Sequence, residues 1–471
     1  MTISCSESPG KRHCAVLAFP FGGHARPLLG LVCRLARAST TLDVRFSFFS
    51  TAISNQLTFS QADGSLPDNV MAYDVEDGGP SNRVFMGNPH EPANLFLEAA
   101  PENIRKAMGL AVAETGVEIS CLISDAFLSF SGELAEEMRV PWILVWISMP
   151  YPLYVYANIR LIQQVCSNSR TAVPDVDDDD RARNVIPDVP EVLVEDLPEG
   201  VLGPGDIESD LVGILGNLGA LLPRASAIVM NFYHELDPTA LTNNLRITLP
   251  NLLYLGFLTL SLPPPPKPQS PLSDADISNR CISWLERQEP RSVAYIGFGT
   301  LAMLPENEFH ALAEALEESN VPYIWSLQDD LKEKLPTGFL QRVGARGIVA
   351  SWAPQIEVLA HSSTGVFVTH CGSNSVYESV ANGVPMICRP FFGDHRMNGR
   401  IVEEVWEIGV RVEGGAITKN GVLKSLRLIL ADQAGKAMRE KVHALKELVQ
   451  SAAGPNGRAA EDFRTLLKIV S

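Results

Sequence analysis

Apolar runs bounded by glycine or polar residues alternate along the chain with segments whose apolar residues recur at helical spacing. The first run, residues 14–21, is continuous and ends at Gly22-Gly23-His24, which is typical of a buried parallel strand. Residues 27–38 then carry apolar side chains at helical spacing, with Pro27 suited to a first turn. This order recurs and indicates a doubly wound α/β sheet. We expect further strands at 44–49, 119–124, 142–147, 292–297, 323–327, 348–350 and 365–369, and helices from about Ser131, at 151–165 and at 306–318.

Two stretches break this alternation. Residues 171–183 are acidic and predict a solvated loop, and residues 261–276 are rich in proline and predict a stiff, extended linker. A chain of 471 residues is too long for one ordinary core, so two domains are expected. The predicted fold class is α/β, with two Rossmann-like doubly wound domains facing across a cleft that binds ligands at the carboxyl ends of the strands. We expect an N-terminal domain at 1–250, the linker at 251–276, a C-terminal domain at 277–455 and a C-terminal helix at 456–471 that packs back on the N-terminal domain.

The charge balance limits the partners. The net charge of −17 argues against nucleic acid, because a phosphate backbone requires a surplus of lysine and arginine. It also argues against docking on an anionic membrane surface. An anionic nucleotide remains possible, since backbone N–H groups at a helix N-terminus supply the positive end of a dipole.

Cysteine usage and the first residues indicate the compartment. The eight cysteines are scattered, without a CxxC or a zinc spacing, and several lie in apolar stretches where a reduced, buried thiol is expected. The apolar run near the N-terminus is only about eight residues long, too short for a membrane span. No small-residue cleavage site follows it. We therefore expect a cytoplasmic protein.

The densest chemical signal lies between residues 352 and 395. Thr369-His370-Cys371-Gly372 closes a buried strand, and the residues after it open a helix whose free N–H groups suit a diphosphate. Gly372 permits close approach of the backbone to a ligand, and His370 and Ser375 can donate to phosphate oxygens. Glu378, one turn into the helix, suits the hydroxyls of a ribose.

The ends of the same stretch offer contacts for a base and a sugar. Trp352 provides a flat face for a uracil ring, with Gln355 beside it, and Asp394 and His395 can grip sugar hydroxyls. Taken singly, each residue has an ordinary structural interpretation: a lone tryptophan is more often part of a core, and a lone glutamate on a helix usually faces solvent. The whole ordered set is much harder to obtain by chance.

Residues 352–395 resemble the 44-residue signature box of plant family 1 UDP-glycosyltransferases, and nearly the whole box matches. The resemblance extends along almost all of the chain, to the flavonoid 3-O-glycosyltransferase branch. It rests also on Phe19-Pro-Phe-Gly-Gly-His24-Ala-Arg-Pro27, Ala100-Pro-Glu-Asn103, Asp125-Ala-Phe127, Gly297-Phe-Gly-Thr300 and Ile324-Trp-Ser326. It implies a GT-B fold and a UDP-sugar as cosubstrate, with Thr300, Ala353, Ser373 and Asn374 as further donor-binding residues.

The resemblance also implies the catalytic pair. In that branch the histidine after the first strand is the general base, which here is His24, and an aspartate stabilises the imidazolium, which here is Asp125. The acceptor oxygen would displace UDP in a single step that inverts the anomeric centre. Backbone amides at 372–375, with His370, Ser375 and Thr300, would meet the charge of the leaving group.

No metal cofactor is expected. Two DxD motifs, Asp175-Val-Asp177 and Asp274-Ala-Asp276, match the pattern by which other glycosyltransferases bind manganese. Both fall in acidic or proline-rich stretches that we predict as loops without a preceding strand, so we do not assign them a metal.

Three departures from the box and its surroundings bear on the sugar. Ser373 replaces the usual tryptophan, His395 replaces the glutamine of glucose users, and Ile147 replaces a threonine that contacts the sugar in relatives. Relatives that end the box in histidine often prefer UDP-galactose or a UDP-pentose. One misplaced hydroxyl leaves a buried hydrogen-bonding group unpaired, at a cost of about 1–3 kcal/mol. UDP-galactose is therefore the expected donor, ahead of UDP-glucose.

The acceptor residues are assigned by position in the resemblance. His90 and Tyr156 stand where relatives carry a glutamine and a histidine, Phe127 offers an aromatic wall, and Gly22 and Ile147 complete the set. Pro198 stands where another glutamine is common, which removes one donor. All could instead be ordinary packing or loop residues. A flavonol glycosylated at its 3-hydroxyl is the leading acceptor, followed by anthocyanidins.

The sequence is compatible with three other functions. A UDP-sugar epimerase shares the two-domain architecture but needs neither the box nor an aromatic acceptor. A non-catalytic protein that binds UDP-sugar or flavonoid is favoured only by Ser373 and Ile147. C-glycosylation with the same histidine is not excluded. We expect a monomer, without nucleic acid or integral membrane association.

Overall fold

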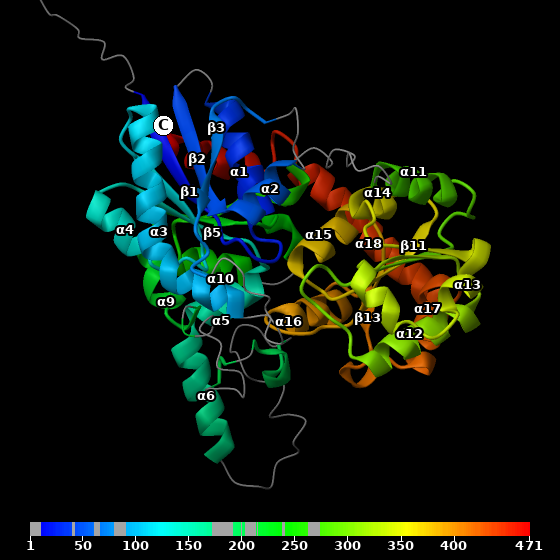
Figure 1. Ribbon diagram of the computed structural model, residues 1–471. Coiled ribbons are helices and arrows are strands. Elements are labelled where there is room, and N and C mark those ends of the chain that lie inside the picture. Colours follow the sequence, from blue (N-terminus) through cyan, green and yellow to red (C-terminus); the bar gives the residue numbers. More distant parts are fainter. Residues whose placement is uncertain are drawn as a thin grey trace, which may run out of the picture. The chain divides into compact units, whose positions relative to one another are not determined.

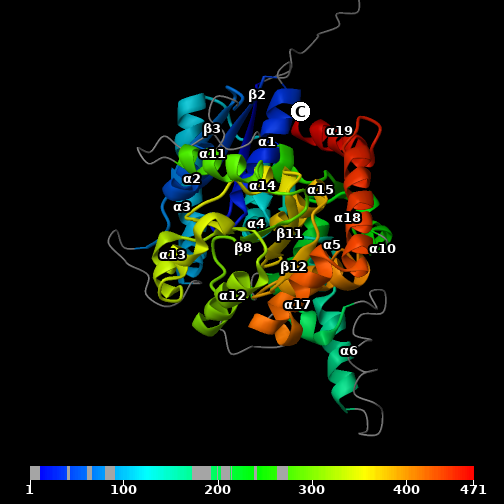
Figure 2. The same cartoon turned by 90° about the vertical axis from the view of Figure 1, so that its right-hand side faces the viewer.

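The computed structural model describes residues 11–39, 43–60, 66–79, 91–171, 192–198, 200–202, 213, 215–237, 241–261 and 274–471. They form two compact units, each built on its own parallel sheet with helices packed against it (Figures 1 and 2). Unit 1 comprises Met1–Gln164, Gly200–Pro266 and Ala452–Ser471, and unit 2 comprises Val165–Glu199 and Lys267–Ser451.

The sheet of unit 1 has seven parallel strands in the order β3-β2-β1-β4-β5-β6-β7. The first strand and the fourth are neighbours, so the order reverses direction between them. The strands are β1 Arg12–Leu17, β2 Val44–Thr51, β3 Val70–Val75, β4 Cys121–Asp125, β5 Trp142–Trp146, β6 Ala227–Met230 and β7 Leu252–Tyr254.

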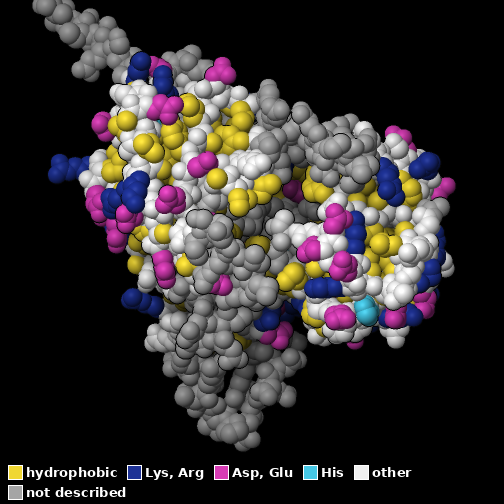
Figure 3. Space-filling model, viewed as in Figure 1, with side chains coloured by type: hydrophobic (Ala, Val, Ile, Leu, Met, Phe, Trp, Pro, Cys, Tyr) yellow, Lys and Arg dark blue, Asp and Glu magenta, His cyan; other side chains and the backbone are white. Residues whose placement is uncertain are grey.

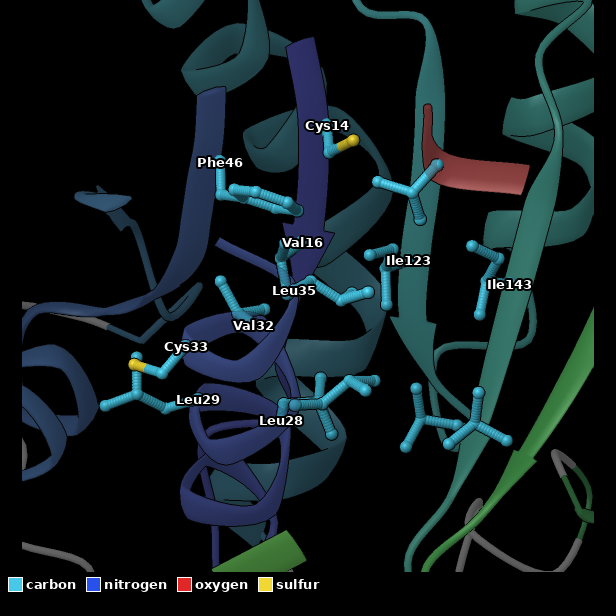
Figure 4. Packing of buried hydrophobic residues seen from close by; sticks show 14 of the residues in the cluster. Cys14, Val16, Leu28, Leu29, Val32, Cys33, Leu35, Phe46, Ile123 and Ile143 are labelled. Carbon is cyan, nitrogen blue, oxygen red and sulfur yellow. The ribbon is translucent and has the colours of Figure 1, made fainter. Parts of the chain in front are cut away.

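Helix α1 (Ala25–Ala38) shows how this sheet is covered. Its apolar residues recur on one face, and Leu28, Val32 and Leu35 are fully buried. Figure 4 shows Val32 and Leu35 lying near Val16 and Ile123, which belong to the two central strands, and Leu28 further along the helix. Burying such side chains contributes about 1.5–3 kcal/mol each, so the apolar pattern of the sequence is what fixes the helix on the sheet.

Other helices of unit 1 connect these strands or cover the sheet. They are α2 Ala52–Ser60, α3 Glu91–Thr115, α4 Ser131–Met138, α5 Pro150–Ala157, α6 Ile159–Thr171, α9 Leu218–Leu221, α10 Leu241–Thr248 and α19 Arg458–Val470, with short 3₁₀ turns at η2 Leu222–Arg224, η3 His234–Leu236 and η4 Leu258–Ser261. The expected helix at 151–165 is interrupted at Asn158, where α5 ends and α6 begins, and α6 continues past the unit boundary.

The sheet of unit 2 repeats the same arrangement with six parallel strands, in the order β10-β9-β8-β11-β12-β13. Here the reversal lies between β8 and β11. The strands are β8 Val293–Gly297, β9 Tyr323–Ser326, β10 Gly347–Ala350, β11 Thr364–Thr369, β12 Met386–Cys388 and β13 Gly409–Arg411. Both units therefore have the strand order of a Rossmann fold, as the sequence predicted.

The helices of unit 2 cover this second sheet, and α12 and α17 pack side by side (Figure 2). They are α11 Asp274–Leu285, α12 Glu306–Ser319, α13 Phe339–Val343, α14 Gln355–Ala360, α15 Ser373–Asn382, α16 His395–Arg400, α17 Lys419–Leu430 and α18 Gln433–Ala452. Shorter turns are η1 Val194–Asp196, η5 Asp329–Lys334, η6 Gly344–Arg346, the π-helical η7 Ile401–Val405 and η8 Glu413–Gly415.

The segment at 251–276, expected to be an extended linker, contains regular secondary structure in part of its length. Leu252–Tyr254 is a buried apolar strand that extends the first sheet, and Leu258–Ser261 is a 3₁₀ turn. Residues 262–273 lie outside the described residues. Asp274 and Asp276, expected in a loop, belong to the start of α11. The other acidic motif, Asp175 to Asp177, lies outside the described residues.

The segment around η1 also differs from expectation, because it belongs to unit 2 rather than to a continuous domain at 1–250. Buried Asp196 pairs there with Arg400, and its other oxygen accepts a hydrogen bond from Arg411 at 2.9 Å. These ion pairs hold the segment on unit 2, because a buried carboxylate that lost its arginine partners would destabilise the fold.

Two further features concern the surface and the thiols. Acidic and basic side chains are mixed over the face shown in Figure 3, so the net charge is not gathered there in one patch. The seven cysteines within the described ranges are buried and form no disulfide with one another. Among the described residues, no helix is long and apolar enough to cross a membrane.

Helix α19 is fastened to unit 1 by a buried ion pair, which gives a test of stability. Asp462, 5% exposed, accepts two hydrogen bonds from Arg246, at 3.0 and 2.8 Å, and one from the Tyr254 amide at 2.8 Å. Asp462→Ala removes the carboxylate from this largely buried pair, so we expect the free energy of unfolding in urea to fall by about 3 kcal/mol. The matched control is Glu137→Ala, which breaks an exposed pair with Arg105 and should cost less than about 1 kcal/mol. Equal losses in the two variants would contradict the role of this pair.

Candidate active site

His24 stands where the chain leaves the central strand of unit 1. The turn after β1 contains Gly22, whose φ of +61° is a left-handed conformation that favours glycine. His24 directly precedes α1. β1 and β4 are the strands between which the order reverses. The carboxyl ends of two such strands are where ligands commonly bind in open α/β sheets, and His24 lies at this edge.

Asp125 is the last residue of β4 and binds His24 directly. The distance from His24 Nδ1 to Asp125 Oδ2 is 2.8 Å, and the aspartate side chain is 1% exposed. The other carboxylate oxygen accepts the Phe127 amide at 2.9 Å. A carboxylate that accepts at Nδ1 selects the tautomer with the proton on Nδ1, so Nε2 carries the lone pair of a base. The sequence-predicted pair is therefore brought together.

Aromatic rings surround this histidine. The ring of Phe127 lies 4.4 Å from that of His24, and the ring of Phe19 lies 5.0 Å away. Phe19 is also 5.4 Å from Phe21 and 6.2 Å from Phe96, measured between ring centroids. Phe127 was predicted from the sequence, whereas the others were not. Phe19 and Phe21 stand in the motif before His24 and could have been found there, but Phe96 lies in α3 without any local signal.

The remaining acceptor candidates differ in how they are placed. Ile147 is 9% exposed and its side chain belongs to the hydrophobic core of unit 1. Tyr156 is 5% exposed, and its ring lies 6.0 Å from that of Trp146. Neither offers much surface to a ligand in this structure. His90 lies outside the described residues.

The turn between β11 and α15 has the shape predicted for a diphosphate site. Cys371 has a φ of +68°, an uncommon value for a residue with a side chain, and Gly372 precedes the first turn of α15. The amides of Ser373, Asn374 and Ser375 open this helix and have no acceptor one turn earlier in it. Strained left-handed residues of this kind persist where the surroundings fix them, often at functional sites.

His370 lies close to two glycines, one in this turn and one in the loop after β8. A methyl group added to Gly372 would lie 2.4 Å from His370 Nε2, and one added to Gly299 would lie 2.9 Å from the ring. Burial, and secondly the neighbouring His395, lower the pKa of His370 to about 3. The ring is therefore neutral at physiological pH. Thr300 follows Gly299 in the same loop and is exposed.

His395 begins α16 and lies against His370. The two rings are 4.9 Å apart and nearly perpendicular, at 87°. Burial lowers the pKa of His395 to about 4, so this imidazole is also neutral. The preceding residue, Asp394, shares a hydrogen bond of 3.0 Å with the side chain of Asn398. These contacts bring the residues predicted for phosphate and sugar recognition into one cluster.

A second group of predicted residues is joined by hydrogen bonds between α14 and α15. Gln355 Nε2 donates to Glu378 Oε2 at 2.7 Å and to Ser375 Oγ at 3.1 Å. Its carbonyl oxygen accepts the hydroxyl of Tyr295 at 3.2 Å. Tyr295 was missed from the sequence because it is a buried residue within strand β8. The network fixes the side chain of Glu378, one turn into the helix.

Trp352 and Ala353 lie just before α14. Ala353 is 3% exposed and Trp352 is half-buried. Ser373, which stands where the family box has tryptophan, is 8% exposed. Among the described residues, no three His, Cys, Asp or Glu side chains gather into a group that could hold a metal ion.

Comparison with known proteins agrees with this arrangement. The family described as UDP-glucoronosyl and UDP-glucosyl transferase matches residues 270–448. A flavonol 3-O-glucosyltransferase of Actinidia chinensis var. chinensis is 46% identical over 97% of this chain and 96% of its own length. An anthocyanidin 3-O-galactosyltransferase of Rhododendron delavayi is 44% identical over 98% and 97%.

A solved structure extends the likeness to the fold. It is the crystal structure of a UDP-glucose: anthocyanidin 3-O-glucosyltransferase in complex with UDP, which is 43% identical over 98% of this chain and 99% of its own, with a TM-score of 0.87. This match confirms the GT-B fold. The chain therefore belongs to the plant family 1 UDP-glycosyltransferases, in the flavonoid 3-O-glycosyltransferase branch.

Proposed function

We propose that this enzyme transfers a hexose from a UDP-sugar to the 3-hydroxyl of a flavonol or related flavonoid, with inversion and without a metal. The observation that carries the proposal is the 2.8 Å bond between His24 and buried Asp125 at the carboxyl edge of the first sheet. The relatives named as flavonol and anthocyanidin 3-O-glycosyltransferases support the choice of acceptor.

His24 acts as the general base. Its Nδ1 is occupied by Asp125, so Nε2 takes the proton of the acceptor hydroxyl as that oxygen attacks the anomeric carbon. The Asp125 carboxylate then stabilises the imidazolium, as the aspartate does in hydrolase triads, but no covalent nucleophile is needed. The bond from the anomeric carbon to UDP breaks in the same step, and an α-linked donor gives a β-glycoside.

The acceptor is a flat phenolic molecule. Phe127 is half-buried and its ring lies 4.4 Å from that of His24, so it offers an apolar face for stacking beside the base, with buried Phe19 packed behind the histidine at 5.0 Å. A phenolic or enolic hydroxyl also has a pKa within a few units of that of imidazole, which makes the proton transfer feasible. Gly22, His90, Ile147 and Tyr156 remain proposed acceptor positions.

The donor is held by the turn before α15. The opening amides of that helix receive the diphosphate, with Ser375, Thr300 and His370 as further donors, and they meet the negative charge that develops on UDP as it leaves. Neutral His370 contributes a directed N–H rather than a positive charge, because its pKa is about 3. Trp352, Ala353 and Gln355 take the uracil, Glu378 the ribose, and Asp394 and His395 the sugar.

UDP-galactose is the proposed sugar donor, ahead of UDP-glucose. His395 replaces the glutamine of glucose users, and Ser373 replaces a larger tryptophan beside the sugar. Both glucosyl- and galactosyltransferases occur among the relatives. The seven cysteines of the described ranges are buried and form no disulfide with one another, which suits a reducing compartment, so we further propose a cytoplasmic enzyme, which acts as a monomer.

Substitution of Gly372 by alanine tests the diphosphate site. The added methyl would meet His370 Nε2 at 2.4 Å, so either the ring or the turn must shift. We expect the affinity for UDP, measured by calorimetry, to fall about tenfold or more, since several phosphate hydrogen bonds are displaced. Gly109→Ala is the matched control, because a methyl there meets nothing within 4 Å and UDP affinity should not change. Unchanged affinity in Gly372→Ala would place the nucleotide elsewhere.

Replacement of His24 by alanine tests the base. We expect kcat to fall by about 10²–10⁴, while the affinity for UDP-sugar stays within about threefold, because only proton transfer is lost. The control is His443→Ala, at a histidine whose side chain is 66% exposed on α18, and it should keep full activity. A near-normal rate in His24→Ala would mean that another group is the base.

A panel of flavonoids incubated with four UDP-sugars and analysed by mass spectrometry tests the reaction itself. We expect a flavonol 3-O-glycoside, with a larger kcat/KM for UDP-galactose than for UDP-glucose. Equal or better use of UDP-glucose would overturn the donor assignment. An acid-resistant product would indicate C-glycosylation, a free epimerised sugar nucleotide would indicate an epimerase, and binding without turnover would indicate a binding protein.

A further inference from the structure

Asn398, in the middle of α16, is completely buried beside the donor-binding cluster. Its Nδ2 donates to the Cys371 carbonyl at 3.0 Å and to Asp394 Oδ2 at 3.0 Å. Both neighbours are acceptors, so the orientation of the amide is fixed by chemistry: its nitrogen must face them. Its oxygen has no hydrogen-bond partner among the residues that the structure describes.

The two partners of Asn398 belong to different parts of the proposed donor site. Cys371 is the left-handed residue just before Gly372 and the opening amides of α15. Asp394 immediately precedes His395 and is proposed to grip sugar hydroxyls. α16 also lies beside α15 (Figure 1). One buried amide therefore joins the diphosphate turn to the sugar-binding carboxylate.

The helix that carries Asn398 is itself firmly held. Arg400, two residues further on, is 7% exposed and pairs with Asp196. The chain then continues as the π-helical turn Ile401–Val405, a type of irregularity that is often found at functional sites. Because the ion pair of Arg400 holds α16 in place beyond Asn398, the Asn398 amide has a fixed position. Its hydrogen bonds therefore fix the Asp394 carboxylate and the Cys371 carbonyl relative to each other.

We infer that Asn398 is a positioning residue, which holds the Asp394 carboxylate at a fixed place relative to the diphosphate turn and so takes part in the choice between epimeric sugars. This inference rests on the proposed function. Epimers differ in the direction of one hydroxyl, and a carboxylate discriminates between them only while its own orientation is fixed. Without the Asn398 amide, Asp394 loses a charge-assisted hydrogen bond and can turn toward either hydroxyl.

The test compares kcat/KM for UDP-galactose and for UDP-glucose in the wild type and in Asn398→Ala. Loss of a hydrogen bond to a carboxylate should lower kcat/KM for the preferred donor by about tenfold. The loss for the other donor should be smaller, so the ratio between the donors moves toward one by about threefold or more. Asn398→Ser, which creates a smaller cavity and keeps one hydroxyl donor, should give an intermediate ratio and serves if the alanine variant does not fold.

Asn55→Ala is the matched control. Asn55, 5% exposed in unit 1, likewise donates to backbone carbonyls, of Ser50 and Tyr73, and to a carboxylate, Asp74 Oδ1, at 2.8 Å. Its loss should destabilise the protein to a similar extent, measured by the melting temperature, but should leave the donor ratio unchanged. A ratio that is also unchanged in the Asn398 variants, with both donors affected equally, would reduce Asn398 to a structural role and overturn the inference.

A double-mutant cycle identifies the route of the effect. In an Asp394→Ala background, adding Asn398→Ala should not move the donor ratio any further, because the carboxylate through which the amide acts is gone. A further shift of the same size would overturn the inference. Absence of glycosyl transfer by the wild type would instead remove the proposed function, whereas an active wild type with an unaltered ratio in the variants removes only the role of Asn398.

Discussion

The reversal of strand order at the centre of each sheet decides where the reactive side chains of this protein lie. In each sheet, successive strands are added outward from the centre, first in one direction and then in the other. The connections therefore cover opposite faces of the sheet, and the carboxyl ends of the two central strands are left open. In unit 1 these ends carry His24 and Asp125, and in unit 2 they carry Thr300 and His370. The same constraint thus positions a base in one unit and a nucleotide turn in the other.

Local contacts then determine the tautomer or the protonation state of each histidine at these strand ends. Asp125 is buried and accepts two hydrogen bonds, which fixes the tautomer of His24. His370 and His395 are neutral because burial lowers their pKa values to about 3 and about 4. The donor site is therefore proposed to bind an anion with amides and neutral donors, in a protein whose net charge is −17. Direction of dipoles, rather than a surplus of cations, would supply the attraction.

The sequence predicted the alternation of strands and helices and the two Rossmann-like sheets, because apolar period is a local signal. The pairing of His24 with Asp125, residues far apart in the chain, was implied only by the resemblance to the family. It did not predict β7, whose three residues are too few for a pattern, or the assignment of η1 to unit 2, which depends on ion pairs of Asp196 with distant arginines. Tyr295 and Asn398 were missed for the same reason: each makes a side-chain hydrogen bond to a residue far along the chain, which no local pattern reveals.

A crystal structure of the protein with bound UDP-sugar is the most direct measurement of the central claim. We predict that the diphosphate lies on the opening amides of α15, next to Gly372 and His370, with the sugar beside Asp394 and the uracil on Trp352. A nucleotide found at another place in unit 2, or a diphosphate held without the amides of residues 373–375, would contradict the account.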